Sequence, residues 1–141
     1  MQSNKKSKWL VYTVLVGLLP FLMRILIFLV VDKNHNNIDI ISANDFIAFG
    51  LVLHICNINE IEHIYLADEK QWKTIQNGMS IVFIAFYSIL YTLTLISDNF
   101  QNVIDLQSLT ICVFVLSVFS FCLSYSIYDR LSALESQGLI K

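Results

Sequence analysis

Four long apolar stretches, separated by short polar segments, run along the chain. The first covers residues 9–31, which are 23 positions with one charged side chain, Arg24. A helix of this length measures about 34 Å and can cross a bilayer core of about 30 Å. Pro20 lies near its middle and predicts a kink, because proline cannot donate the backbone hydrogen bond that a helix interior requires.

The second stretch, residues 43–66, is the least apolar of the four. Its dense apolar part spans only about residues 46–58, which is too short to cross a bilayer unaided. Apolar positions continue beyond it, so we expect one helix over about residues 42–69. Its last turns would leave the membrane as an acidic, amphipathic stalk. Three residues are candidates to cap its N-terminus: Ser42, Asn44 and Asp45.

The third and fourth stretches cover residues 75–96 and 106–128. We expect the third span to start at Asn77-Gly78 or slightly earlier. A separate short amphipathic helix is expected over residues 129–137, because leucines recur there at helical spacing. No repeat or linker divides the sequence, so the four spans belong to one domain.

The composition supports a membrane location. Of the 141 residues, 56% are hydrophobic and 14% are charged, whereas soluble domains have about 45–50% apolar and about 25% charged residues. A soluble chain this short could not bury so much apolar surface, which excludes a soluble enzyme and a disordered chain. The formal net charge of −2 offers no basic surface for direct nucleic-acid binding. We therefore predict an all-α integral membrane protein, folded as a four-transmembrane-helix bundle that spans residues 1–141.

The distribution of positive charge predicts the orientation of this bundle. Only Lys33 falls in the first loop, and Arg24 lies within a span, whereas the other seven Lys and Arg fall on the opposite side: Lys5, Lys6, Lys8, Lys70, Lys73, Arg130 and Lys141. Because cytoplasmic segments carry the excess of Lys and Arg, both termini and the loop at residues 60–75 should be cytoplasmic. The expected location is the inner membrane of a bacterium.

Arg24 is a charge inside a predicted span, and such residues usually face protein, water or a partner. Asp45 lies just inside the start of the next helix, within reach of an extended arginine. The main interpretation is a buried Arg24–Asp45 pair that fixes helix packing. The alternatives are a charge that lines a pore or binds lipid phosphate, and a side chain that snorkels to the interface.

His54 and Asn57 share one helix face with Gly50 and Ile61, because their spacings are three and four residues. A polar face of this kind normally turns into a helix bundle. We expect His54 to form a hydrogen bond that packs two helices. A proton relay or pH sensor is the alternative.

The fourth span carries small residues at helical spacing, Ser117, Ser120 and Ser124, and the third carries a polar stripe that includes Tyr87. Small side chains let helices approach closely in lipid, so we interpret the serines as packing residues. A hydrated pore lined by hydroxyl groups is the alternative.

Polar and aromatic residues cluster where the second span reaches the cytoplasm and in the loop that follows. We predict that they dock a cytosolic partner: Glu60, Glu62, His63, Asp68, Glu69 and Trp72. Glu60-x-x-His63 also resembles half of a di-metal helix motif, but a complete site would need symmetry-related copies. No metal and no cofactor are therefore expected.

The sequence contains no nucleophile elbow, phosphate-binding loop or zinc-protease motif, so we expect a protein that is not an enzyme. A four-span bundle of this size encloses little volume alone and is expected to work as a homo-oligomer. The two leading functions are a membrane sensor or scaffold that recruits a cytosolic effector, and a small oligomeric ion channel.

Two segments carry a resemblance to a known family: Gly-Leu-Leu-Pro-Phe-Leu-Met-Arg at residues 17–24 and Asp-Phe-Ile-Ala-Phe-Gly-Leu-Val-Leu-His at residues 45–54. With the chain length, the four predicted spans and the cytoplasmic ends, they make the chain similar to the membrane subunit (KwaA) of the bacterial Kiwa anti-phage defence system. The resemblance covers most of the chain. It implies a tetramer in the inner membrane that responds to membrane perturbation by phage. It also implies a cytosolic DNA-binding effector subunit as partner.

Overall fold

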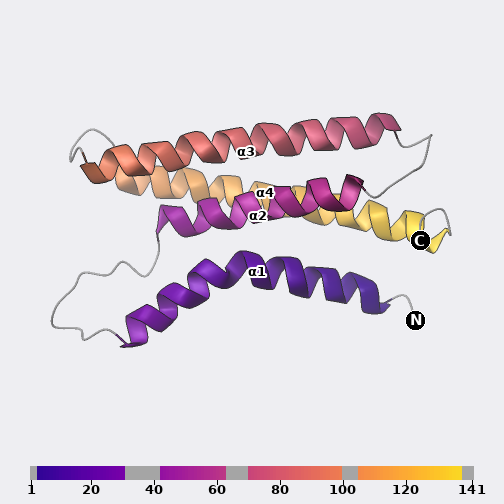
Figure 1. Ribbon diagram of the computed structural model, residues 1–141, viewed down its shortest axis with the longest axis horizontal. Helices are drawn as coiled ribbons and strands as arrows, with labels where there is room; N and C mark the ends of the chain where they lie inside the picture. Colours follow the sequence, from indigo (N-terminus) through magenta and orange to yellow (C-terminus); the bar gives the residue numbers. More distant parts are fainter. Residues whose placement is uncertain (1–2, 31–41, 63–69, 100–104, 138–141) are drawn as a thin grey trace.

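A computed structural model describes residues 3–30, 42–62, 70–99 and 105–137. They form four helices: α1 (Ser3–Val30), α2 (Ala43–Glu62), α3 (Lys70–Asn99) and α4 (Leu106–Ser136). All four run along the long axis of the molecule (Figure 1). The predicted all-helical fold with four helices is thereby confirmed for the described residues.

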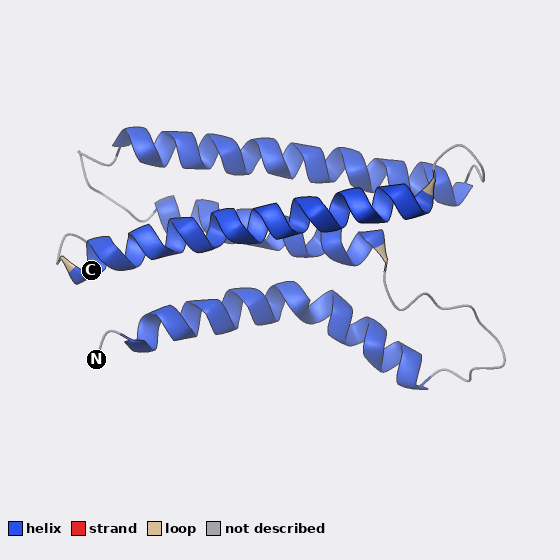
Figure 2. Cartoon of the chain, turned by 180° about the vertical axis from the view of Figure 1, so that it is seen from behind, coloured by secondary structure: helices blue, strands red, loops and turns tan. Residues whose placement is uncertain are grey.

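The shortest helix, α2, lies at the centre of the bundle. Helices α1, α3 and α4 all pack against it, and α1 lies on the side of α2 that faces away from α3 (Figures 1 and 2). Ser42 caps its start, because its hydroxyl accepts a hydrogen bond from the Asn44 amide at 3.3 Å. Asn44 and Asp45, the other candidate caps, have side-chain partners on other helices.

Two apolar clusters hold the helices together. The larger cluster joins α2, α3 and α4 through Ala43, Ile47, Tyr87, Leu109 and Val113. The smaller cluster lies at the other end of α2, where Ile61 packs against Ile127 and Leu131 of α4 and Trp72 of α3. The central helix therefore contributes a buried side chain to each cluster.

Three of the helices are long and apolar enough to cross a membrane, over Thr13–Val30, Lys70–Ser97 and Leu106–Leu134. Their outward faces carry large exposed apolar side chains; Leu29, Ile89 and Phe119 are 77%, 58% and 63% exposed. Water would make so much exposed apolar surface unfavourable, whereas lipid does not. These faces support a membrane protein.

Two predicted boundaries are wrong. Helix α3 begins at Lys70 and continues through Asn77-Gly78, since one glycine costs a helix only about 1 kcal/mol. Helix α4 continues unbroken to Ser136, so no separate terminal helix exists over residues 129–137. Leu131 and Leu134 are buried and extend the packed face of α4. The predicted end of the second helix lies outside the described residues.

Helix α1 bends between its two halves (Figures 1 and 2). Pro20 lies inside this helix, where it removes one backbone hydrogen bond and its ring displaces the preceding turn. Beyond the bend, the second half of α1 runs away from α2 (Figures 1 and 2), and Arg24, shortly after the bend, still pairs with Asp45.

Candidate functional site

A row of buried polar side chains runs between α2, α3 and α4. Each member is at most 3% exposed: His54, Asn57, Tyr87, Ser117, Ser120 and Ser124. Polar groups at this depth of a membrane protein must find partners inside the protein, because lipid offers none. The row is therefore the best-defined candidate site of the described residues.

Ser120 is the centre of this row. Its Oγ lies 2.9 Å from Nε2 of His54 on α2 and 2.9 Å from the hydroxyl of Tyr87 on α3. One serine on α4 thus joins all three helices. The imidazole of His54 also stacks on the ring of Phe83, with centroids 4.7 Å apart.

The row continues in both directions from Ser120. Ser117 Oγ donates to the backbone carbonyl of Phe46 at 2.9 Å, and it accepts a longer hydrogen bond of 3.5 Å from Tyr87. In the other direction, Asn57 Nδ2 donates to Ser124 Oγ at 2.8 Å. The polar face of the second span and the serines of the fourth, which were predicted separately, are partners of one another.

Sequence reasoning placed Tyr87 only in a polar stripe and missed its bridging role. The tyrosine ring reaches the row because α2 has a glycine opposite it. A Cβ at Gly50 would lie 2.0 Å from Cζ of Tyr87, so no other residue fits there without movement. Gly50 lies one turn before His54, and this spacing is the signal that could have located the tyrosine.

One polar atom of the row has no partner. Nδ1 of His54 is buried and makes no hydrogen bond among the described residues. An unmade buried hydrogen bond usually costs about 1–3 kcal/mol. This atom is the place in the row where an added donor or acceptor would be favourable.

The predicted Arg24–Asp45 pair is present and joins α1 to α2. Nε of Arg24 donates to one carboxylate oxygen at 2.5 Å, and Nη2 lies 3.5 Å from the other. The carboxylate side chain is 9% exposed, whereas the arginine side chain is 27% exposed. Arg24 is therefore the more exposed member of the pair.

The predicted docking residues are only partly described. Glu62 is exposed and Glu60 is half-buried, whereas His63, Asp68 and Glu69 lie outside the described residues. Trp72 is also half-buried; it packs in the smaller cluster, and the guanidinium carbon of Arg130 lies 4.8 Å from its ring centre. Lys73 Nζ donates to the Glu62 carbonyl at 2.8 Å.

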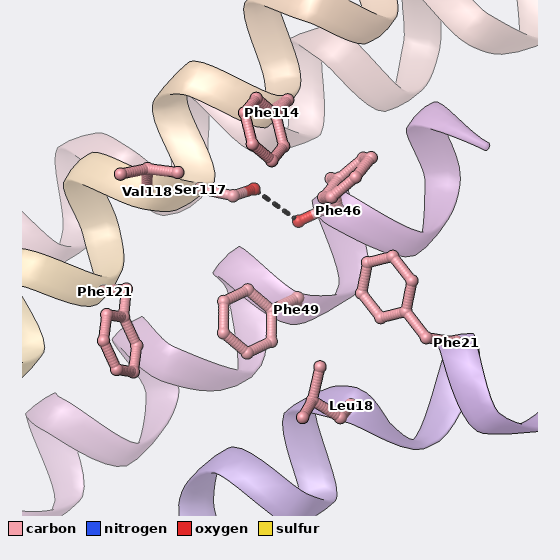
Figure 3. A pocket seen from close by; sticks show the side chains of 8 residues that line it. All are labelled: Leu18, Phe21, Phe46, Phe49, Phe114, Ser117, Val118 and Phe121. Atoms are coloured by element: carbon pink, nitrogen blue, oxygen red, sulfur yellow. Dashed lines mark hydrogen bonds between the residues drawn. The ribbon is translucent and has the colours of Figure 1, made fainter. Parts of the chain in front are cut away.

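An open apolar cleft lies between α1, α2 and α4, and sequence reasoning did not predict it. Figure 3 shows phenylalanine rings from all three helices around it; its volume is about 280 Å³. Phe46 makes edge contacts with Phe21 and Phe114, with centroids 5.0 and 5.2 Å apart. Phe49 stacks near Phe121 at 6.4 Å. In the sequence, the phenylalanines lie three residues apart in α2 and seven residues apart in α4, which puts each pair on one helix face. This spacing is the signal that could have predicted the cleft.

Among the residues that the structure describes, no group of three or more His, Cys, Asp or Glu side chains could hold a metal ion. His63 of the half motif Glu60-x-x-His63 is not among them. Comparison of the chain with protein-family models, with curated proteins and with solved structures finds no match.

Proposed function

We propose that the chain is a multi-pass subunit of the bacterial inner membrane that assembles with copies of itself and recruits a cytosolic effector. It acts as a sensor or scaffold rather than as an enzyme. Helix α2 is the proposed fourth span, since its 20 residues measure about 30 Å and the other three helices pack around it. Four crossings put both termini on the cytoplasmic side, where Lys and Arg predominate.

The length of α3 and α4 is the observation that carries this proposal. They contain 30 and 31 residues and measure about 45 Å, about 15 Å more than a bilayer core. Charged side chains from three helices gather at one end of the bundle: Glu60, Glu62, Lys70, Lys73, Asp129 and Arg130. These charges put the extra length on that side, outside the hydrocarbon.

The charged end is suited to bind a soluble partner. The Trp72–Arg130 contact and the Ile61 cluster hold α2, α3 and α4 together there, so the surface is preformed. Its described side chains carry charges of both signs. The resemblance to the Kiwa membrane subunit supports an anti-phage role, a tetramer and a DNA-binding effector as partner.

Affinity purification tests the recruitment. The full chain is purified from its host cells with its copurifying proteins, and the Glu60→Lys/Glu62→Lys variant is compared with Gln107→Lys, which adds positive charge at the opposite end. We expect the same cytosolic protein with wild type and Gln107→Lys and at least a tenfold loss with the double variant. If wild type and both variants recover equal amounts of the cytosolic protein, docking at this end is contradicted.

The second candidate is a small oligomeric ion channel, and the unpartnered Nδ1 of His54 within a buried polar row favours it. Protons move along hydrogen-bonded groups of this kind in membrane proteins. In planar bilayers, purified protein should then conduct, and His54→Gln should change the conductance. A protein without conductance would eliminate this candidate and leave recruitment untouched.

A further inference from the structure

From the phenylalanine cleft and the ion pair at its end, we infer that the chain holds one phospholipid of the surrounding bilayer. The acyl chain lies in the cleft between α1, α2 and α4, and the phosphate lies against the guanidinium of Arg24. This lipid site is independent of partner recruitment and requires only that the helices lie in a membrane.

The walls of the cleft select hydrocarbon. The hydroxyl of Ser117 is the one side-chain polar group among its described lining residues, and it donates to the Phe46 carbonyl at 2.9 Å (Figure 3). Both polar atoms therefore have partners within the protein. An occupant gains nothing from polar groups here and loses nothing by lacking them.

The size of the cleft favours an acyl chain over a second helix. Its volume of about 280 Å³ is roughly twice that of the ~150 Å³ apolar cavity that holds a benzene molecule. Along α4 its lining extends from Phe114 to Phe121, about 10 Å of helix axis. A helix with its side chains is about 10–12 Å wide and would not enter, whereas a stretch of hydrocarbon chain fits lengthwise.

The charge at one end of the cleft fits a phosphate. Arg24 lies one turn beyond Phe21 on α1, and its partner Asp45 directly precedes Phe46 on α2. The rings of Phe21 and Phe46 touch at this end of the cleft. The Asp45 side chain is the more buried member of the pair and the Arg24 side chain is the more exposed, so a phosphate would reach the pair from the arginine side. Arginine forks match phosphate oxygens.

Native mass spectrometry of the delipidated full chain in detergent tests both halves of the site. We expect one dioleoyl phosphatidylglycerol per chain, bound at least tenfold more weakly by Val118→Trp, which fills the cleft. Phe119→Trp is the matched control, because Phe119 neighbours Val118 on α4 but lies outside the cleft and is 63% exposed. Equal lipid binding by the two variants would overturn the assignment.

A second pair of measurements tests whether the lipid phosphate lies on Arg24. Arg24→Gln/Asp45→Asn removes both charges and keeps groups that can hydrogen-bond to each other. It should weaken phosphatidylglycerol binding at least fivefold and leave dioleoylglycerol binding, which lacks a phosphate, unchanged. If wild type binds dioleoylglycerol as tightly as phosphatidylglycerol, the phosphate does not lie on Arg24 and the proposal fails in this form.

Photocrosslinking of the wild-type chain keeps the test independent of variant folding. A phosphatidylglycerol with a diazirine in its acyl chain should label peptides that contain residues 18–21 and 114–121. Labelling spread evenly over exposed positions such as Ile89 of α3 would overturn the site. A second copy of the chain as occupant would give a Val118→Cys disulfide dimer and no labelling of the cleft, which also overturns it.

Discussion

At the scale of single residues, the close approach of Tyr87 to α2 depends on Gly50. A methyl group at this position would lie 2.0 Å from Cζ and 2.3 Å from the hydroxyl oxygen of the tyrosine. Both distances are shorter than a van der Waals contact, so the methyl group would clash with the ring. The ring is completely buried and fixed by hydrogen bonds to Ser117 and Ser120, so it cannot move aside cheaply.

We predict that Gly50→Ala lowers the free energy of unfolding in detergent by about 1–3 kcal/mol, the usual cost of overpacking a core. The matched control is Gly78→Ala, also in a helix, where a Cβ meets nothing within 4 Å. Alanine is the better helix former by about 1 kcal/mol, so Gly78→Ala should leave stability unchanged or raise it. Equal destabilisation by both would contradict the contact with Tyr87.

The Arg24–Asp45 pair supports a second prediction at this scale. Arg24→Ala leaves a carboxylate side chain that is 9% exposed without this arginine. Breaking a fully buried pair costs about 3–5 kcal/mol, so we expect a smaller loss for this part-buried pair. Arg24→Ala/Asp45→Ala removes both charges and should be more stable than the single variant. Unfolding by denaturing detergent measures the difference, and a double variant that is as unstable as Arg24→Ala would argue against the pair.

At the scale of elements, the start of α4 depends on a capping carboxylate. Asp105 accepts hydrogen bonds from the Ser108 hydroxyl at 2.6 Å and the Gln107 amide at 3.1 Å. These bonds, the Ser108 bond first, lower the pKa of Asp105 below its ordinary value of 3.8. The residue lies outside the membrane-spanning segments and is exposed.

We predict that Asp105→Ala speeds amide hydrogen exchange in the first turn of α4, whereas Asp105→Asn, which still caps, changes it less. Because the folded state lowers this pKa, the capping contribution is present above pH 3.8 and is lost as the pH falls through the depressed value. The difference between wild type and Asp105→Ala should therefore disappear in strong acid. A difference that stays constant over that range would exclude ionised Asp105 as the cap.

Which features of the elements could be predicted depends on how local they are. The helical face of His54 and Asn57 and the spacing of the serines on α4 are local patterns, and both appeared in the sequence. That Ser120 would meet His54 and Tyr87 together depends on the register between three helices, which no local pattern fixes. The end of α4 was missed for the same reason, since Leu134 is buried only by packing between helices.

At the scale of the whole molecule, α2 is the one described helix that does not qualify as a candidate span, and its central position explains why. Its polar residues face the other helices: His54 and Asn57 pair with α4, and Asp45 pairs with α1. A hydropathy average counts these side chains as if lipid surrounded them. The other three helices shield the polar residues of α2 from lipid. A helix shielded in this way can cross a bilayer even though its sequence does not identify it as a membrane span.

The proposed crossing of α2 predicts on which side α3 begins, and cysteine labelling can measure this. In a chain without its three native cysteines, Gln71→Cys at the start of α3 and Gln107→Cys at the start of α4 are both exposed positions. In intact spheroplasts we expect a membrane-impermeant maleimide to label Gln107→Cys at least tenfold more than Gln71→Cys. After lysis the two should label equally.

If α2 returned to the side from which it started, α3 would begin outside the cell and Gln71→Cys would label in intact spheroplasts. The charged end of the bundle would then face away from the cytoplasm, and no cytosolic partner could reach Glu62. The lipid site would remain possible, because the cleft needs only α1, α2 and α4 beside one another in the bilayer. The labelling result thus separates recruitment, which depends on four crossings, from lipid binding, which depends on the packing of three helices.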